Sequence, residues 1–150
     1  MIKKTEISIE LPPLDEQRLL VLKADTERAI TILKANLNAK SFPKVENIDY
    51  TTIDPRIFNT LEQGWTAPPA FLIDAWFNQL KALFKEYGSD AKLGFLLGLQ
   101  GRSADRRIRA YRNGAEIIPY GIWRTFLELT GRVVVDVKPV LGLFDSESFD

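Results

Sequence analysis

Hydrophobic residues recur at two different periods along this chain, and the change of period separates its first predicted elements. Apolar and polar residues alternate over residues 2–11, which predicts a short half-buried strand that ends at Pro12. From Leu14 the apolar residues recur every three or four positions instead, and this spacing predicts an amphipathic helix over residues 14–38. The apolar stripe of this helix consists of Leu19, Leu22, Ala29, Ile30, Leu33 and Leu37.

Prolines and polar residues interrupt the pattern over residues 39–69. Asp54 followed by Pro55 is typical of a helix start, because Asp accepts a bond from a free backbone N–H and Pro suits the first turn. The glycine and prolines that follow predict a boundary between an N-terminal part, residues 1–66, and a helical part, residues 67–150. Three apolar residues of the short helix are expected to face inward: Ile57, Phe58 and Leu61.

Four helical patterns follow in the second part. Two of its tryptophans, Trp76 and Trp123, lie on apolar helical faces and are expected in the core, whereas Trp65 in a loop is either a core residue or an exposed anchor. The β-branched run Val133–Val137 predicts a short strand. The predicted helices cover residues 69–87, 90–97, 104–112 and 119–131.

A group of arginines marks the third of these helices. On a helical wheel the apolar residues Ala104, Ile108 and Tyr111 share one face, which predicts that this face is buried. The polar residues on the opposite face form an outward stripe of Arg102, Arg106, Arg109 and Asn113, while Arg107 and Arg112 flank the buried face. The helix therefore presents guanidinium groups and one amide on the side that does not pack. Ser103 is the expected helix cap.

The preceding helix has the features that a close helix crossing needs. Gly94 lies between apolar residues, at the place where a second helix crosses closely. Gly98 follows at the position of the turn, where positive φ is required. Two short helices joined by such a turn and flanked by stabilising helices form a helix-turn-helix unit.

Three short segments of this region form one pattern: Leu93–Leu99, then Arg106–Gly114, then Ile118–Trp123. The pattern resembles the lambda-repressor-like helix-turn-helix regulators of phages, plasmids and integrative elements, and the resemblance covers about residues 70–131. In many of these proteins the recognition helix ends with an aromatic residue, two further residues and glycine. The chain between Gly98 and Ile108 is longer than in the tight form of the motif, so an enlarged turn is expected at residues 99–103.

The fold class predicted from these patterns is mainly α, of the α+β kind. It combines a helical helix-turn-helix C-terminal part, a strand-plus-helix N-terminal part and a short C-terminal strand. The N-terminal part, residues 1–66, is a candidate region for dimerisation or interaction.

Composition narrows the possible functions. The chain has 150 residues and a formal net charge of zero, so nucleic acid would have to be bound by a focused patch rather than by bulk charge. Histidine and cysteine are both absent, which removes the commonest general base and all thiolate chemistry. We therefore expect no enzyme, no metal and no cofactor. No secretory signal or transmembrane run is recognised, and a cytoplasmic location is expected.

The leading hypothesis is that the protein binds double-stranded DNA sequence-specifically and reads the major groove with helix 103–113. We expect it to be a transcriptional regulator of a mobile genetic element. Such proteins usually dimerise, and the candidate dimer surfaces are the N-terminal strand and helix or the Val133–Val137 strand. The expected base contacts are Arg106, Arg109 and Asn113, and the expected phosphate contacts are Arg102, Ser103, Arg107 and Arg112.

Two other interpretations stay open. The arginines can form an ordinary solvated face, paired with acids such as Asp105, Glu116 or Glu128. A helix-turn-helix scaffold can also serve as a protein-interaction module, an adaptor or an inhibitor of a host protein, with the arginine face on an acidic protein surface.

Overall fold

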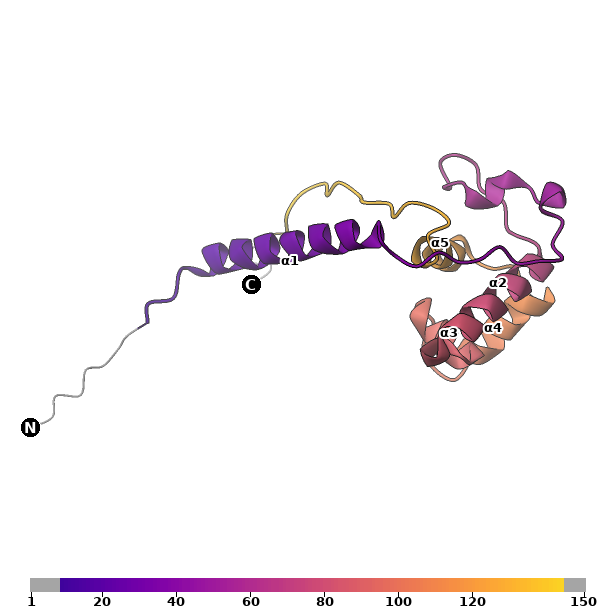
Figure 1. The fold of residues 1–150 in the computed structure, drawn as a ribbon. Coiled ribbons are helices and arrows are strands. Elements are labelled where there is room, and N and C mark those ends of the chain that lie inside the picture. The colour runs from indigo at the N-terminus through magenta and orange to yellow at the C-terminus, as the bar shows by residue number, and fades with distance from the viewer. Residues whose placement is uncertain (1–8, 145–150) are drawn as a thin grey trace, which may run out of the picture. The chain divides into compact units, whose positions relative to one another are not determined.

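The computed structural model describes residues 9–144, which divide between two units (Figure 1). The first unit is Met1–Phe42 and the second is Pro43–Asp150. The second unit contains the core and the arginine-bearing helix, so it is the part that positions the candidate site.

The first unit contains a single helix, α1, Leu14–Asn36. The predicted helix over residues 14–38 is thus confirmed, with its end two residues earlier than predicted. Asp15 and Glu16 lie in its first turn and Lys34 in its last, which suits the helix dipole at both ends. None of its side chains is buried, although its predicted apolar stripe includes large residues such as Leu22 and Leu33. No hydrophobic core is therefore formed by α1 within this unit.

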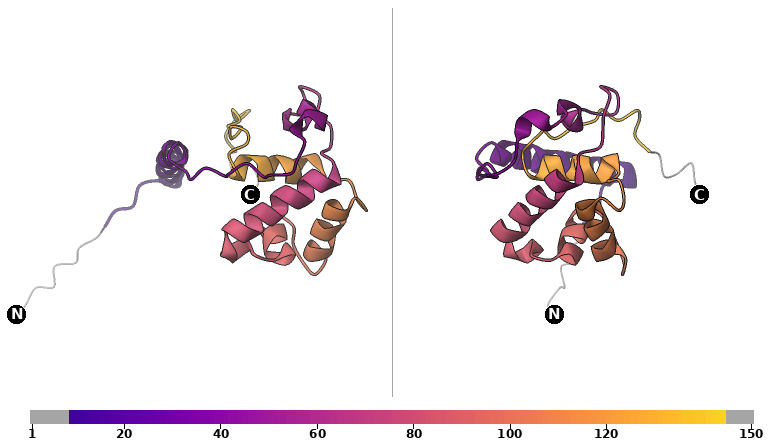
Figure 2. Two further views of the ribbon diagram at one scale, coloured as in Figure 1. Left: turned by 45° about the vertical axis from the view of Figure 1, so that its right-hand side comes forward. Right: turned by 90° about the vertical axis from the view of Figure 1, so that its right-hand side faces the viewer.

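Helices of the second unit enclose one hydrophobic core (Figure 2). Two short 3-10 helices precede α2 (Ala70–Leu83), and a third follows it. The predicted helix over residues 69–87 is therefore divided at Phe84, where the backbone is extended. The elements are η1 Tyr50–Thr52, η2 Pro55–Phe58, α2 Ala70–Leu83, η3 Lys85–Tyr87, α3 Asp90–Leu96, α4 Ala104–Asn113 and α5 Tyr120–Leu129.

Aromatic side chains from α2 and α5 form the centre of this core. The indoles of Trp76 and Trp123 stack with 5.8 Å between ring centroids and an interplanar angle of 2°. Phe77 packs edge-on against Phe126 at 4.9 Å. The prediction that both tryptophans belong to the core is confirmed, since both are buried. Trp65 is half-buried with its ring against Tyr120, so it is not the exposed anchor that its loop position allowed.

The segment before α2 belongs with the helical core rather than with α1. Asp54 accepts a hydrogen bond from the backbone N–H of Arg56, starts η2, and so presents Ile57 to the core, where it is 1% exposed. The indole N–H of Trp123 donates to the carbonyl oxygen of Ile57 at 3.0 Å. The structure divides the chain after Phe42, whereas the predicted boundary lies between residues 66 and 67. Of the three residues expected to face inward, Phe58 and Leu61 are exposed.

The predicted strands are not found in the described part of the chain, residues 9–144, so the α+β assignment is wrong and the protein is helical there. Most of the predicted strand over residues 2–11 lies outside the described residues, and residues 9–11 have no regular structure. Val133–Val137 has none either. A strand is stable only when a neighbour pairs with its backbone, and β-branched residues alone supply none. Val133 packs on the core while Val134 and Val137 stay exposed.

Two fragments test the boundary between the units. Residues 43–150 should unfold within about 4 °C of the full chain, the shift expected for about 1 kcal/mol in a domain of this size, because this fragment contains every residue of the hydrophobic core. Residues 67–150 should be less stable by about 2–5 kcal/mol, because the fragment lacks Ile57 and leaves a cavity beside Trp123. Thermal and urea unfolding followed by circular dichroism measures both. Equal stability of the two fragments would show that residues 43–66 contribute nothing.

Candidate nucleic-acid interface

Helices α3 and α4 cross closely because Gly94 has no side chain. A Cβ atom placed there would lie 3.2 Å from the Cβ of Ala104 and 3.4 Å from Cγ1 of Ile108. Gly98 then ends α3 with φ of 92°, and the N–H of Leu99 bonds back to the carbonyl of Gly94 at 2.8 Å. Both glycine predictions are confirmed. The crossing fixes which face of α4 is turned inward.

The packed face of α4 contains the three predicted residues, since Ala104, Ile108 and Tyr111 are all buried. The opposite side carries Arg106 and Arg109, which are both exposed. Arg102 is exposed too, but it lies in the turn before the helix and not on the helix itself. The structure thus places three arginines of the predicted site in solvent, on the turn and on the unpacked side of α4.

Three further residues of the predicted site lie at the ends and on the flank of α4: Ser103, Arg107 and Asn113. Ser103 directly precedes α4, yet its side chain makes no capping hydrogen bond, so the predicted cap is wrong. Its backbone is already helical, with φ −88° and ψ −2°, and the turn continues through a bond from the N–H of Ala104 to the carbonyl of Gly101. Arg107 is half-buried. Asn113, the exposed last residue of α4, accepts a hydrogen bond from the N–H of Ala115.

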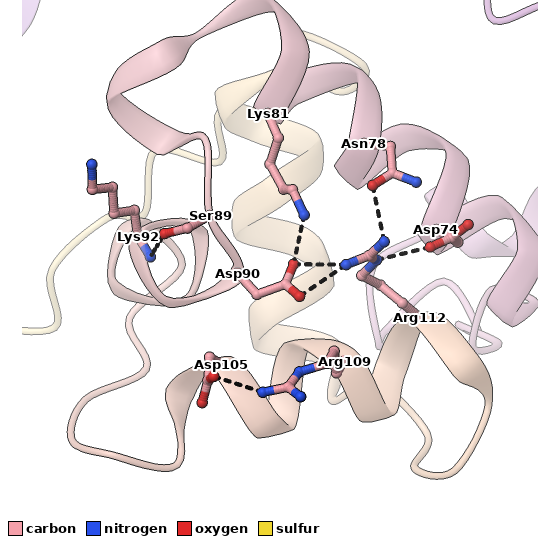
Figure 3. Close-up of polar contacts among 9 residues, drawn as sticks. All are labelled: Asp74, Asn78, Lys81, Ser89, Asp90, Lys92, Asp105, Arg109 and Arg112. Carbon is pink, nitrogen blue, oxygen red and sulfur yellow. Dashed lines mark hydrogen bonds and ion pairs between the residues drawn. The ribbon is translucent and has the colours of Figure 1, made fainter.

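Arg112 differs from the other arginines because its guanidinium group joins three helices (Figure 3). Nε donates to Asp74 of α2 at 2.8 Å and Nη2 donates to Asn78 at 3.0 Å. Nη1 donates to both carboxylate oxygens of Asp90, at the start of α3, at 2.9 and 2.8 Å. Lys81 of α2 adds a further bond to Asp90 at 2.9 Å. We call these five residues the α2–α3–α4 ion cluster.

Arg112, Asp90 and Lys81 of the ion cluster are largely withdrawn from water, whereas Asp74 and Asn78 lie at its exposed edge. The side chain of Arg112 is 21% exposed and that of Asp90 is 13% exposed. Burial lowers the pKa of Arg112, but the hydrogen bond to Asp74 and the charges of Asp90 and Asp74 outweigh it and raise that pKa above its ordinary value. The cluster was not found from the sequence, because its members lie far apart in the chain and no spacing links them.

Arg109 makes a different contact, on the solvent side of α4. Its Nη2 donates to Oδ2 of Asp105, one helical turn earlier, at 2.6 Å (Figure 3). The two side chains are 61% and 41% exposed. Of the acids expected to pair with arginines of the outward stripe, Asp105 is confirmed. Glu128 instead pairs with Arg124 of α5.

Other kinds of site find less support in the described part of the chain. Among residues 9–144, the structure shows no group of acidic side chains that could hold a metal ion. Within the same range, no helix has the length and apolar character needed to cross a membrane. The exposed arginines of the turn and of α4 form the candidate site.

Comparison of this chain with models of protein families, with curated proteins and with solved structures gives no match. The function is therefore argued from the placement of this chain's own residues.

Replacing Arg112 by Ala tests the ion cluster. The change leaves Asp90 and Asp74 without their guanidinium partner, and we expect unfolding to become easier by about 1–3 kcal/mol. The matched control is Arg106→Ala, which removes the same charge from an exposed position of the same helix and should change stability by less than about 0.5 kcal/mol. Urea unfolding of both variants measures the difference. Equal effects would contradict the structural role of Arg112.

Proposed function

We propose that the protein binds double-stranded DNA sequence-specifically and regulates transcription for a mobile genetic element. In this proposal α3, its turn and α4 act as a helix-turn-helix unit, and α4 enters the major groove. The observation that carries the proposal is the two-sidedness of α4: one face packs on α3 at Gly94, and the other presents exposed arginines. A cytoplasmic location follows from the proposed DNA target.

The exposed side chains divide into two proposed roles. Arg106, Arg109 and Asn113 contact base edges, because a guanidinium group matches the two acceptors of guanine and an amide matches adenine. The oxygen of Asn113 already accepts a hydrogen bond from Ala115, so it would have to accept a second one from adenine N6 while an amide N–H donates to N7. Phosphates are contacted from the turn and the flank of the helix, by Arg102, Ser103 and Arg107.

Arg112 is left out of the proposed DNA contacts, because its donors are already engaged by Asp74, Asn78 and Asp90. In this proposal it positions α4 against α2 and α3 instead of touching DNA. A rigid recognition helix reduces the side-chain and backbone ordering that binding would otherwise require.

The neutral net charge predicts how the affinity for DNA should depend on salt concentration. Bulk attraction to DNA is absent, so the salt dependence should come from the few arginines of the patch. With Arg102 and Arg107 on phosphates, each protomer should contribute a slope of about −2 in log affinity against log salt concentration.

Removal of Arg106 and Arg109 is the main test of DNA binding. The double Ala variant should lose binding to a duplex selected from random oligonucleotides by more than about a hundredfold, because each bidentate base contact contributes about 1–3 kcal/mol. Its melting temperature should stay within a few degrees of the wild type, since both side chains are exposed. Fluorescence anisotropy and thermal unfolding measure the two quantities.

A matched control removes the same charge elsewhere. Arg18→Ala with Arg28→Ala takes two exposed arginines from α1 and should leave binding to the selected duplex unchanged. If the α4 variant still bound the selected duplex as the wild type does, or if selection yielded no duplex, the proposal would fail.

A second copy of the chain is the proposed partner of α1. One recognition helix reads few base pairs, so two copies on two half-sites are expected. Leu19, Leu22, Ala29 and Leu33 occupy core positions of a heptad repeat that is interrupted by the polar Thr26, and none of them is buried. This stripe supports self-association through α1.

The test of self-association places charge on the stripe. Leu22→Glu with Leu33→Glu should weaken the dimer by more than about tenfold, because the carboxylates would have to lose water at the seam. The control is Val21→Glu with Ile32→Glu, on another side of α1, which should leave the dimer intact. Sedimentation equilibrium measures both. A wild-type chain that stays monomeric, alone and on the selected duplex, would exclude the dimer.

A second candidate function is a protein-interaction module, favoured by the exposed apolar residues of α1 and by the neutral net charge. The exposed arginines would then contact an acidic protein surface. In that case selection on random oligonucleotides would return no preferred sequence.

A further inference from the structure

An acid lies within the proposed DNA-contacting side of α4, where attraction to phosphates would favour only basic and neutral residues. Asp105 is the second residue of the helix, and its side chain is 41% exposed. The buried residues of α4 are Ala104, Ile108 and Tyr111, so Asp105 is not part of the core. Beside DNA it would face phosphates of the same charge, which weakens binding.

Stability gives only a small reason for this acid. An exposed ion pair between residues i and i+4 of a helix contributes about 0.3–0.5 kcal/mol. An acid in the first turn also suits the positive end of the helix. The dipole contribution would be available at other first-turn positions, but among positions 104–107 only 105 has an arginine four residues later, so the place of this acid selects Arg109 as its partner.

The contact itself indicates a more specific role. Arg109 is proposed to read a base, and its Nη2 donates to Oδ2 of Asp105 at 2.6 Å. An arginine on a helix surface is long and flexible and can reach either a phosphate or a base. A carboxylate that accepts one N–H holds the guanidinium plane along the helix, and the other N–H groups stay available for the two acceptors of guanine.

We propose that Asp105 is a positioning residue that directs Arg109 to guanine and away from phosphate. The inference rests on the proposed DNA-binding function and deepens it, since it assigns to Arg109 a G·C pair in the recognised site. Asp105 lowers overall affinity through repulsion of phosphates and raises discrimination between bases at that one pair. At a mismatched base, the Asp105–Arg109 pair would lie in the groove without the two acceptors of guanine. This loss disfavours the wrong sequence.

The experiment uses the full chain and the duplex selected by the wild type. The base pair read by Arg109 is the one whose substitution no longer affects binding in Arg109→Ala. Asp105→Ala should bind an unrelated duplex as tightly as the wild type or tighter, and its preference for G·C at that pair should fall by about tenfold. The control is Glu116→Ala, which removes the same charge from an exposed residue beyond α4 and should keep the preference.

A double-mutant cycle separates positioning from a general effect on the helix. In the Arg109→Ala background, Asp105→Ala should change the base preference no further, whereas a loss of helix stability would weaken binding to every duplex alike. Thermal unfolding of each variant accompanies the binding measurements.

Three outcomes are distinct. Loss of preference at that pair alone supports the inference. An unchanged preference in Asp105→Ala overturns it and leaves the proposed DNA binding intact. Failure of the wild type to select any duplex overturns the proposed function, and the role of Asp105 falls with it.

Discussion

The contact between α3 and α4 at Gly94 is the constraint on which the arrangement of this unit depends. Because no side chain stands at that position, Ala104 and Ile108 can lie so close that a Cβ atom at Gly94 would be only 3.2–3.4 Å from them. That approach sets the rotation of α4 about its own axis, and the rotation decides which arginines meet solvent. The ion cluster around Arg112 then holds the end of α4 to α2 and to the start of α3. One helix thus carries both a packing contact and an exposed basic side.

Arginines that lie close together in the sequence therefore differ in their surroundings and in the contacts they can make. Arg109 and Arg112 are three positions apart, yet one is largely in solvent and the other is enclosed by two carboxylates and an amide. The helical wheel placed Arg112 beside the buried face but gave no reason to expect its partners, which come from α2 and α3. Helix phase was predictable from this sequence, whereas the acids that meet an arginine across helices depend on the tertiary fold.

The same distinction explains what the sequence predicted of the fold. The helix over residues 14–38, the helices around Ile108 and Trp123, and both glycines of the turn followed from local period and backbone preference, and they are confirmed. The Val133–Val137 strand was wrong because a strand depends on a partner elsewhere in the chain. The predicted boundary after residue 66 differs from the division after Phe42, because prolines mark turns, whereas the contact of Ile57 with the core joins that segment to the second unit.

The distribution of tryptophan gives the protein a useful optical property. All three tryptophans, Trp65, Trp76 and Trp123, belong to the unit Pro43–Asp150, and α1 has none. The indoles of Trp76 and Trp123 are nearly parallel and only 5.8 Å apart, a geometry in which their electronic transitions couple. Ultraviolet emission and near-ultraviolet dichroism therefore report on the core of one unit alone, free of any signal from α1. Conformational events in the unit Pro43–Asp150 can therefore be followed without attaching a dye.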